Sequence, residues 1–171
     1  MLRIFLMIAL QVFLPVSSVL AGQGDGKTFL IHAKTSLKLD DAQICAVPNV
    51  AWTALSKGYT VTILFDASGV TALKKGGMFS GDKTPLDKAA LPERERESLS
   101  SQLGVPLLEV PKDYGEYIRF LKEKKGVNLY ANRTMMLLYK IDDSEIEPAV
   151  TPIGLEEMVK LFETADIYVA Y

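Results

Sequence analysis

Two short apolar runs separated by a helical segment most constrain how this chain can fold. Residues 28–33 and 59–65 are rich in β-branched and aromatic side chains, as in strands that are buried on both faces. Between them, residues 41–57 carry an apolar stripe, with acidic residues at the start and Gly58 at the end. A strand, a helix and a strand in this order form a unit with parallel strands. The sequence therefore predicts an α/β fold.

The remaining segments extend this pattern. Pro48 falls inside the first helix and predicts a kink or a break there. The long segment 74–92 contains Met78 and Phe79 in polar surroundings, and we expect these two side chains to contact the domain or a partner. The other predicted elements are helices at 70–75, 93–103, 112–125, 132–140 and 155–164, an extended piece at 105–110, and strands at 127–131 and 166–171.

The first 21 residues have the pattern of a secretory signal peptide. A positive start, an apolar run over residues 4–16 and a small-residue end at Ala21 follow one another. The apolar run is shorter than the roughly 20 residues that span a bilayer. We therefore expect cleavage after Ala21, a periplasmic or secreted protein without stable membrane insertion, and one domain over residues 22–171; a retained anchor is the alternative.

Overall charge and the single cysteine exclude several classes of protein. The 171 residues include 19 basic and 21 acidic side chains, and no basic cluster indicates a nucleic-acid partner. Neither a metal site nor a cofactor is expected, since the chain lacks His and Cys at metal-ligand spacing, and no Ser/His/Asp order supports a hydrolase. With Cys45 as its one cysteine, an exported chain cannot form an internal disulfide.

Three polar residues are expected at the carboxyl ends of predicted strands. His32 and Asp66 lie at the ends of the first two strands, and Asn132 follows the strand at 127–131. Ligands gather at this edge of a parallel sheet, so we expect these three residues, with Arg133 and Thr134, to line a ligand-binding site. Structural roles are the alternative: a neighbour could satisfy His32, and Asp66 and Asn132 are good caps.

Cys45 is the one candidate for covalent chemistry. It shares a helix flank with Asp41 and Asn49, and a nearby carboxylate raises rather than lowers the pKa of a thiol. Structural burial of this cysteine is therefore the expectation, and a reactive thiol is the alternative.

Three stretches resemble the DsrE/DsrF-like (DsrEFH-like) family: LSKGYTVTILFDASGV, KKGVNLYANRTM and LEEMVKLFETADIYVAY. The resemblance covers essentially the whole of residues 22–171. It implies a three-layer α/β/α sandwich on a mainly parallel sheet of about five strands, often assembled into trimers or hexamers. Active members are cytoplasmic sulfur-relay proteins, in which a cysteine after the strand that matches residues 127–131 carries a persulfide. Here the matching position is Asn132, and a carboxamide cannot carry sulfane sulfur.

The sequence thus leaves two main functional hypotheses. The first is an exported DsrE-like module, not an enzyme, that binds a small ligand, such as a sulfur compound, or a protein partner, including itself as a homo-oligomer. The second is a periplasmic sulfur or redox carrier that uses Cys45 as its sulfur-accepting thiol. A purely structural oligomer is the fallback.

Overall fold

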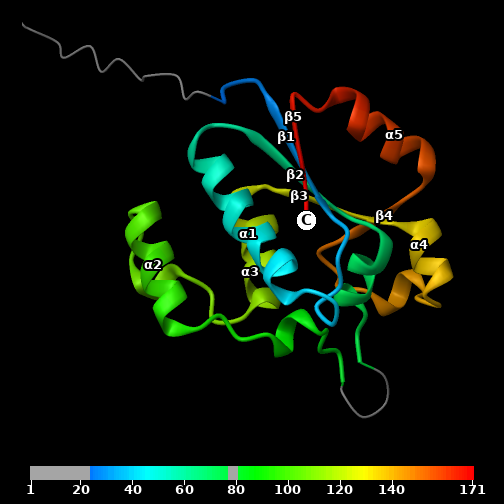
Figure 1. The fold of residues 1–171 in the computed structure, drawn as a ribbon, viewed down its shortest axis with the longest axis horizontal. Helices are drawn as coiled ribbons and strands as arrows, with labels where there is room; N and C mark the ends of the chain where they lie inside the picture. Colours follow the sequence, from blue (N-terminus) through cyan, green and yellow to red (C-terminus); the bar gives the residue numbers. More distant parts are fainter. Residues whose placement is uncertain (1–23, 77–80) are drawn as a thin grey trace, which may run out of the picture.

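The computed structural model describes residues 24–76 and 81–171. At its centre is a sheet of five parallel strands in the order β4-β3-β2-β1-β5, which crosses the middle of the molecule in Figure 1. In chain order the strands are β1 (Thr28–Ala33), β2 (Thr60–Phe65), β3 (Asn128–Asn132), β4 (Thr151–Ile153) and β5 (Ile167–Ala170). The five-stranded parallel sheet agrees with the predicted fold class.

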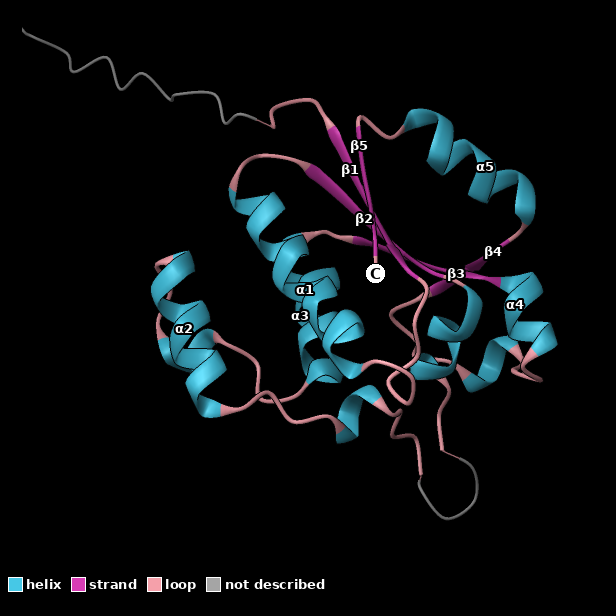
Figure 2. Ribbon diagram, in the orientation of Figure 1, coloured by secondary structure: helices cyan, strands magenta, loops and turns pink. Residues whose placement is uncertain are grey.

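Helices cover both faces of the sheet, as Figure 2 shows. Helices α1 (Asp41–Ser56) and α3 (Tyr114–Lys125) pack on one face, over a large core, and α2 (Glu93–Leu103) lies outside them. Helix α5 (Leu155–Thr164) covers the other face, over a small cluster of Leu30, Leu64 and Ile153. The described structure is therefore a three-layer α/β/α sandwich, as the sequence predicted.

The carboxyl ends of the strands meet at one edge, where short elements follow them. A 3-10 helix, Ala67–Leu73, follows β2, and helix α4 (Arg133–Leu138) follows β3 directly. Further 3-10 turns lie at Leu86–Lys88, Leu107–Glu109 and Asp143–Glu145. This edge holds the three polar residues that the sequence analysis selected.

Pro48 does not break α1 into two pieces; of the predicted kink or break, the structure rules out the break. The helix runs without interruption from Asp41 to Ser56, and Pro48 itself is buried. A proline inside a helix removes one backbone hydrogen bond. Here the helix also buries Ile44, Val47 and Trp52 against the core, and tertiary packing of this kind contributes most of the stability of helices in proteins.

Three other segments differ from the prediction. No strand was predicted at β4, whose middle residue, Pro152, cannot donate to a ladder; an edge strand tolerates this. Residues 105–110 contain a 3-10 turn instead of an extended piece. The Arg96 guanidinium donates hydrogen bonds to the carbonyl oxygens of Leu107 and Val110, which holds these two groups close together. The helix predicted at 70–75 begins earlier, at Ala67. The prediction for Met78 and Phe79 lies outside the described residues.

Candidate functional site

Polar side chains from three neighbouring strands meet at the carboxyl edge of the sheet. His32 lies near the end of β1, Asp66 directly follows β2, and Asn132 is the last residue of β3. His32 Nε2 lies 2.8 Å from Asp66 Oδ2, and Asn132 Nδ2 donates a hydrogen bond to Asp66 Oδ1 at 2.8 Å. The structure thus brings together the three residues that the sequence placed at this edge. We call them the strand-end network.

Strand register explains why these side chains share a face. In the sheet, His32 is paired with Leu64 of β2, and Phe65 with Ala131 of β3. Successive side chains of a strand point to opposite faces, so His32 lies on the same face as Leu64, and the residue after Phe65 returns to that face. The strand-end network therefore lies on the side that α5 covers.

The turn after Asp66 is tightly built. Ala67 has a φ of 45°, a left-handed conformation that costs a residue with a Cβ roughly 1–2 kcal/mol. Two residues later, a Cβ on Gly69 would collide with the carbonyl oxygen of Ala33. The turn therefore presses against the end of β1, which holds the Asp66 carboxyl beside the His32 ring.

Hydrogen bonding keeps Asp66 ionised. The hydrogen bond with His32 is the main reason that the pKa of the Asp66 carboxyl falls to about 2, and the hydrogen bonds from Ala67 N and Asn132 lower it further. Partial burial acts in the opposite direction. A carboxylate can only accept hydrogen bonds, so His32 Nε2 must carry the hydrogen that faces Asp66.

The network reaches the surface through Tyr168, a residue that the sequence analysis missed. His32 Nδ1 lies 2.8 Å from the Tyr168 hydroxyl oxygen. With a hydrogen on Nε2, the neutral ring accepts the Tyr168 hydroxyl hydrogen at Nδ1. Tyr168 is 50% exposed, whereas His32 and Asn132 are buried. The missing information was strand order, because only the pairing of β5 with β1 places Tyr168 beside His32.

Asn132 is fully occupied as a helix cap. Its Oδ1 accepts hydrogen bonds from the backbone N–H groups of Thr134 and Met135, at 2.9 Å and 3.4 Å, and so starts α4. Thr134 itself is exposed and takes part only through its backbone. Arg133 points away from the network and pairs with the exposed carboxylate of Asp143 at 2.9 Å. The side chains of Arg133 and Thr134 therefore take no part in the strand-end network, although the Thr134 backbone contacts Asn132.

Cys45 lies on the opposite side of the sheet from the strand-end network. It is half-buried on α1, where it packs against the large core, so full burial is not observed. Burial raises the pKa of the Cys45 thiol, and the charges of Asp41 and Glu95 raise it further, although the hydroxyl of Tyr114 acts in the opposite direction. This environment favours the protonated thiol, which is the unreactive form.

The polar atoms of the network are all used within the chain. Both nitrogens of His32, both oxygens of Asp66 and both amide atoms of Asn132 have hydrogen-bond partners. Within residues 24–76 and 81–171, no group of three or more His, Cys, Asp or Glu side chains is placed to hold a metal ion. As it stands, the network holds the His32 ring in place and orients the Tyr168 hydroxyl.

The described part of the chain has no helix that is long and apolar enough to span a membrane.

Comparison with known proteins bears on the fold. No family model matches the sequence, and no curated protein matches it. Among solved structures, the ychN protein from E. coli aligns with a TM-score of 0.50 and 13% identity, over 85% of this chain and 98% of that one. A protein of unknown function from Methanobacterium thermoautotrophicum, MTH1491, aligns with a TM-score of 0.49 and 10% identity, over 85% and 99%.

At sequence identities this low, a structural similarity shows the fold alone. The ychN alignment includes nearly all of that protein and most of this one. It supports the DsrE-like fold that the sequence resemblance implies.

Proposed function

We propose that the mature chain is an exported, non-catalytic binding module with a DsrE-like fold, which associates with other copies of itself through one face of α5. This α5 surface consists of Leu155, Val159, Phe162 and Tyr168, which are 36% to 53% exposed. The first three are spaced at i, i+4 and i+7 and so form one stripe along the helix. Tyr168 extends the stripe onto β5, because its ring centroid lies 5.9 Å from that of Phe162.

Helix α5 carries more apolar side chains than its own sheet covers, and this observation carries the proposal. Met158 and Leu161 pack against the small cluster on the sheet, but no residue of α5 is buried. The α5 surface lies beside this inner stripe and has no cover in the described structure. A helix that only lies on its own sheet needs one apolar stripe. The second stripe fits a protein partner, since a soluble chain rarely leaves such a patch uncovered.

The strand-end network fixes the position of one residue of the α5 surface, Tyr168. His32 and Asp66 fix the position of the Tyr168 hydroxyl, and Asn132 caps α4 nearby. Asn132 stands where the resemblance implies a persulfide cysteine, and it offers no nucleophile there. A small ligand at this edge would meet Tyr168 first, because Tyr168 is half exposed, whereas His32 and Asn132 are buried.

Self-association is the first prediction. Light scattering of the chain that begins at Gly22 is expected to give an oligomer mass at micromolar concentration, with the trimer or hexamer implied by the resemblance as the expected sizes. Burying the half-exposed side chains of the α5 surface contributes roughly 1 kcal/mol each. Val159→Asp places a charge in the contact and is expected to weaken association at least about tenfold.

A matched control distinguishes specific association through the α5 surface from non-specific hydrophobic association. Leu108 is an almost fully exposed leucine on the Leu107–Glu109 turn, outside the α5 surface. Leu108→Asp is expected to leave the mass unchanged. A monomer mass for the native chain, or equal effects of the two substitutions, would contradict the proposal.

Export and location belong to the same proposal. The positive, apolar and small-residue order of residues 1–21 supports cleavage after Ala21. The mature chain would then work in the periplasm or outside the cell, away from the cytoplasmic sulfur relay.

The second prediction concerns the alternative of a sulfur or redox carrier. The reduced mature protein, incubated with a sulfane-sulfur donor, is expected to show no gain of one sulfur by intact mass, because the raised pKa of Cys45 leaves little thiolate. A labile adduct that disappears in Cys45→Ser would make the carrier the function and would contradict the binding-module proposal.

A further inference from the structure

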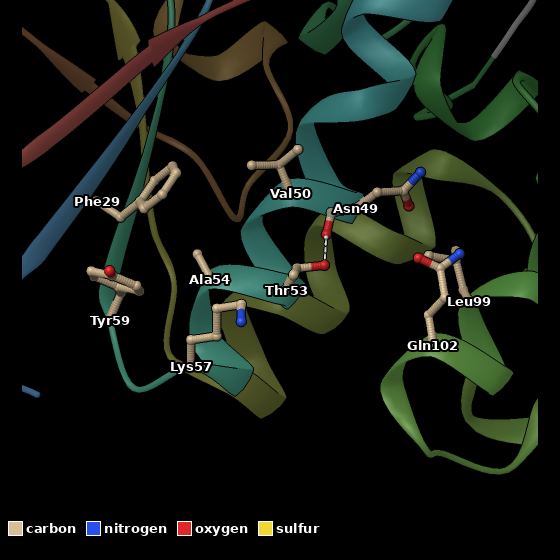
Figure 3. Close-up of a pocket in the computed structure, with 9 residues that line it drawn as sticks. All are labelled: Phe29, Asn49, Val50, Thr53, Ala54, Lys57, Tyr59, Leu99 and Gln102. Carbon is tan, nitrogen blue, oxygen red and sulfur yellow. Dashed lines mark hydrogen bonds between the residues drawn. The ribbon is translucent and has the colours of Figure 1, made fainter. Parts of the chain in front are cut away.

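A cavity of about 420 Å³ lies between α1, α2, strand β1 and the turn before β2. Helix α1 packs on the opposite face of the sheet from α5, so this cavity is separate from the strand-end network and from the α5 surface. Its size is within the range of small-molecule sites in proteins, roughly 300–1,000 Å³. We call it the α1/α2 cleft (Figure 3).

The walls of the cleft are mainly apolar. Phe29 and Tyr59 form one wall as an edge-to-face pair, with ring centroids 5.5 Å apart. Val50 of α1 and Leu99 of α2 face the same space, and Figure 3 shows α2 standing across it from α1. Leu99 is the one buried residue of α2. A ligand with an apolar body would therefore add contacts to a helix that makes few of its own.

The two ends of the cleft differ in charge. Lys57, just after α1, is the one charged side chain that lines it. In the described residues, its ammonium group has no ion pair. Asn49 lies at the other end, eight residues earlier, which corresponds to about 12 Å along a helix. There the nearby carboxylate of Glu95 is already bound by Asn49 Nδ2 at 3.1 Å and the Tyr114 hydroxyl at 3.0 Å.

Two neutral polar side chains stand between these ends. Thr53 donates its hydroxyl hydrogen to the Asn49 carbonyl at 2.9 Å, the contact drawn in Figure 3. Gln102 of α2 donates from Nε2 to Ser98 Oγ at 2.9 Å. Thr53 therefore offers only its hydroxyl oxygen to the cleft, whereas Gln102 keeps its amide oxygen and one amide hydrogen. Lys57 is thus the one charged donor that lines the cleft.

We propose that the α1/α2 cleft binds a small amphipathic monocarboxylate, an acid with an alkyl or aromatic body. The carboxylate binds Lys57, and the body lies between the Phe29–Tyr59 wall and Leu99. A cationic head group would meet the Lys57 charge instead. A neutral alcohol would keep the apolar contacts but lose the ion pair.

The test uses octanoate, octylammonium and octanol as probes of the mature chain, followed by methyl signals in nuclear magnetic resonance spectra. Octanoate is expected to shift the methyl signals of Val50 and Leu99 in a saturable way at millimolar concentrations, and to bind more tightly than octylammonium. Lys57→Gln is expected to weaken octanoate binding about fivefold, the effect of one solvent-exposed ion pair, and to leave octanol binding unchanged.

Two variants complete the design. Thr53→Trp fills the cleft from an exposed helical position and is expected to abolish binding of all three probes. Lys124→Gln, on the exposed face of α3, removes the same charge elsewhere and is expected to change nothing. The proposal is overturned if Val50 and Leu99 do not shift, if octylammonium binds as tightly as octanoate, or if Lys124→Gln weakens binding as much as Lys57→Gln.

Discussion

Replacing Arg119 with Met is expected to destabilise the folded chain by about 3 kcal/mol. The guanidinium of Arg119 bridges two carboxylates, with 2.8 Å to Glu147 Oε2 and 2.8 Å to Asp87 Oδ1. The two carboxylate side chains are only 7% and 11% exposed. Removing the cation leaves two negative charges close together with little water to solvate them. Since Arg119 itself is partly exposed, we place the loss at the lower end of the range for broken buried pairs.

Urea denaturation of the mature chain at about pH 7 measures this loss. Arg133→Met is the matched control, because Arg133 also pairs with a carboxylate at 2.9 Å, but its partner Asp143 is 55% exposed. An exposed pair of this kind contributes less than about 1 kcal/mol. Adding Glu147→Gln to Arg119→Met is expected to recover part of the loss, since it removes one of the unpaired charges. Equal losses for Arg119→Met and Arg133→Met would contradict the prediction.

The parts of the fold that were predicted correctly depend on local sequence. Helix α5 and strand β1 were both predicted with their observed bounds. The pattern of apolar residues that identifies each element lies within the element itself. The meeting of His32, Asp66 and Asn132 was also predictable. Each lies at the end of a separate apolar run, and parallel strands bring their carboxyl ends to one edge.

The parts that were missed depend on contacts between distant residues. Strand β4 has Pro152 in its middle and is recognisable only through its pairing with β3. Tyr168 joins the site because β5 lies beside β1, 136 residues away from His32 in the chain. The environment of Cys45 likewise includes Glu95 and Tyr114, which come from two other helices. Spacing within α1 could identify Asp41 as a neighbour, but not these two.

Replacing Asp66 with Ala is expected to destabilise the chain by about 3 kcal/mol near neutral pH. Asp66 accepts hydrogen bonds from Ala67 N, Asn132 Nδ2 and His32 Nε2, at 2.7 Å, 2.8 Å and 2.8 Å. Alanine leaves three donors without a partner in a largely buried place, and each unsatisfied donor costs roughly 1–3 kcal/mol. We use the lower figure, because Asp66 is 16% exposed and water can replace part of the carboxylate.

Asp66→Asn keeps the size of the side chain and one acceptor oxygen but removes the carboxylate charge, so its effect is expected to depend on pH. The pKa of Asp66 is about 2 in the folded chain and about 3.9 in an unfolded one. Because the folded value is the lower one, the ionised carboxylate stabilises the fold above about pH 4, and this contribution disappears as the pH falls toward 2. After allowance for partial solvent exposure, it amounts to about 2 kcal/mol. Urea denaturation of the native chain and of Asp66→Asn should therefore give free energies of unfolding that differ most near neutral pH and converge near pH 2. A difference that stays constant over this range would show that the charge of Asp66 does not hold the strand-end network together.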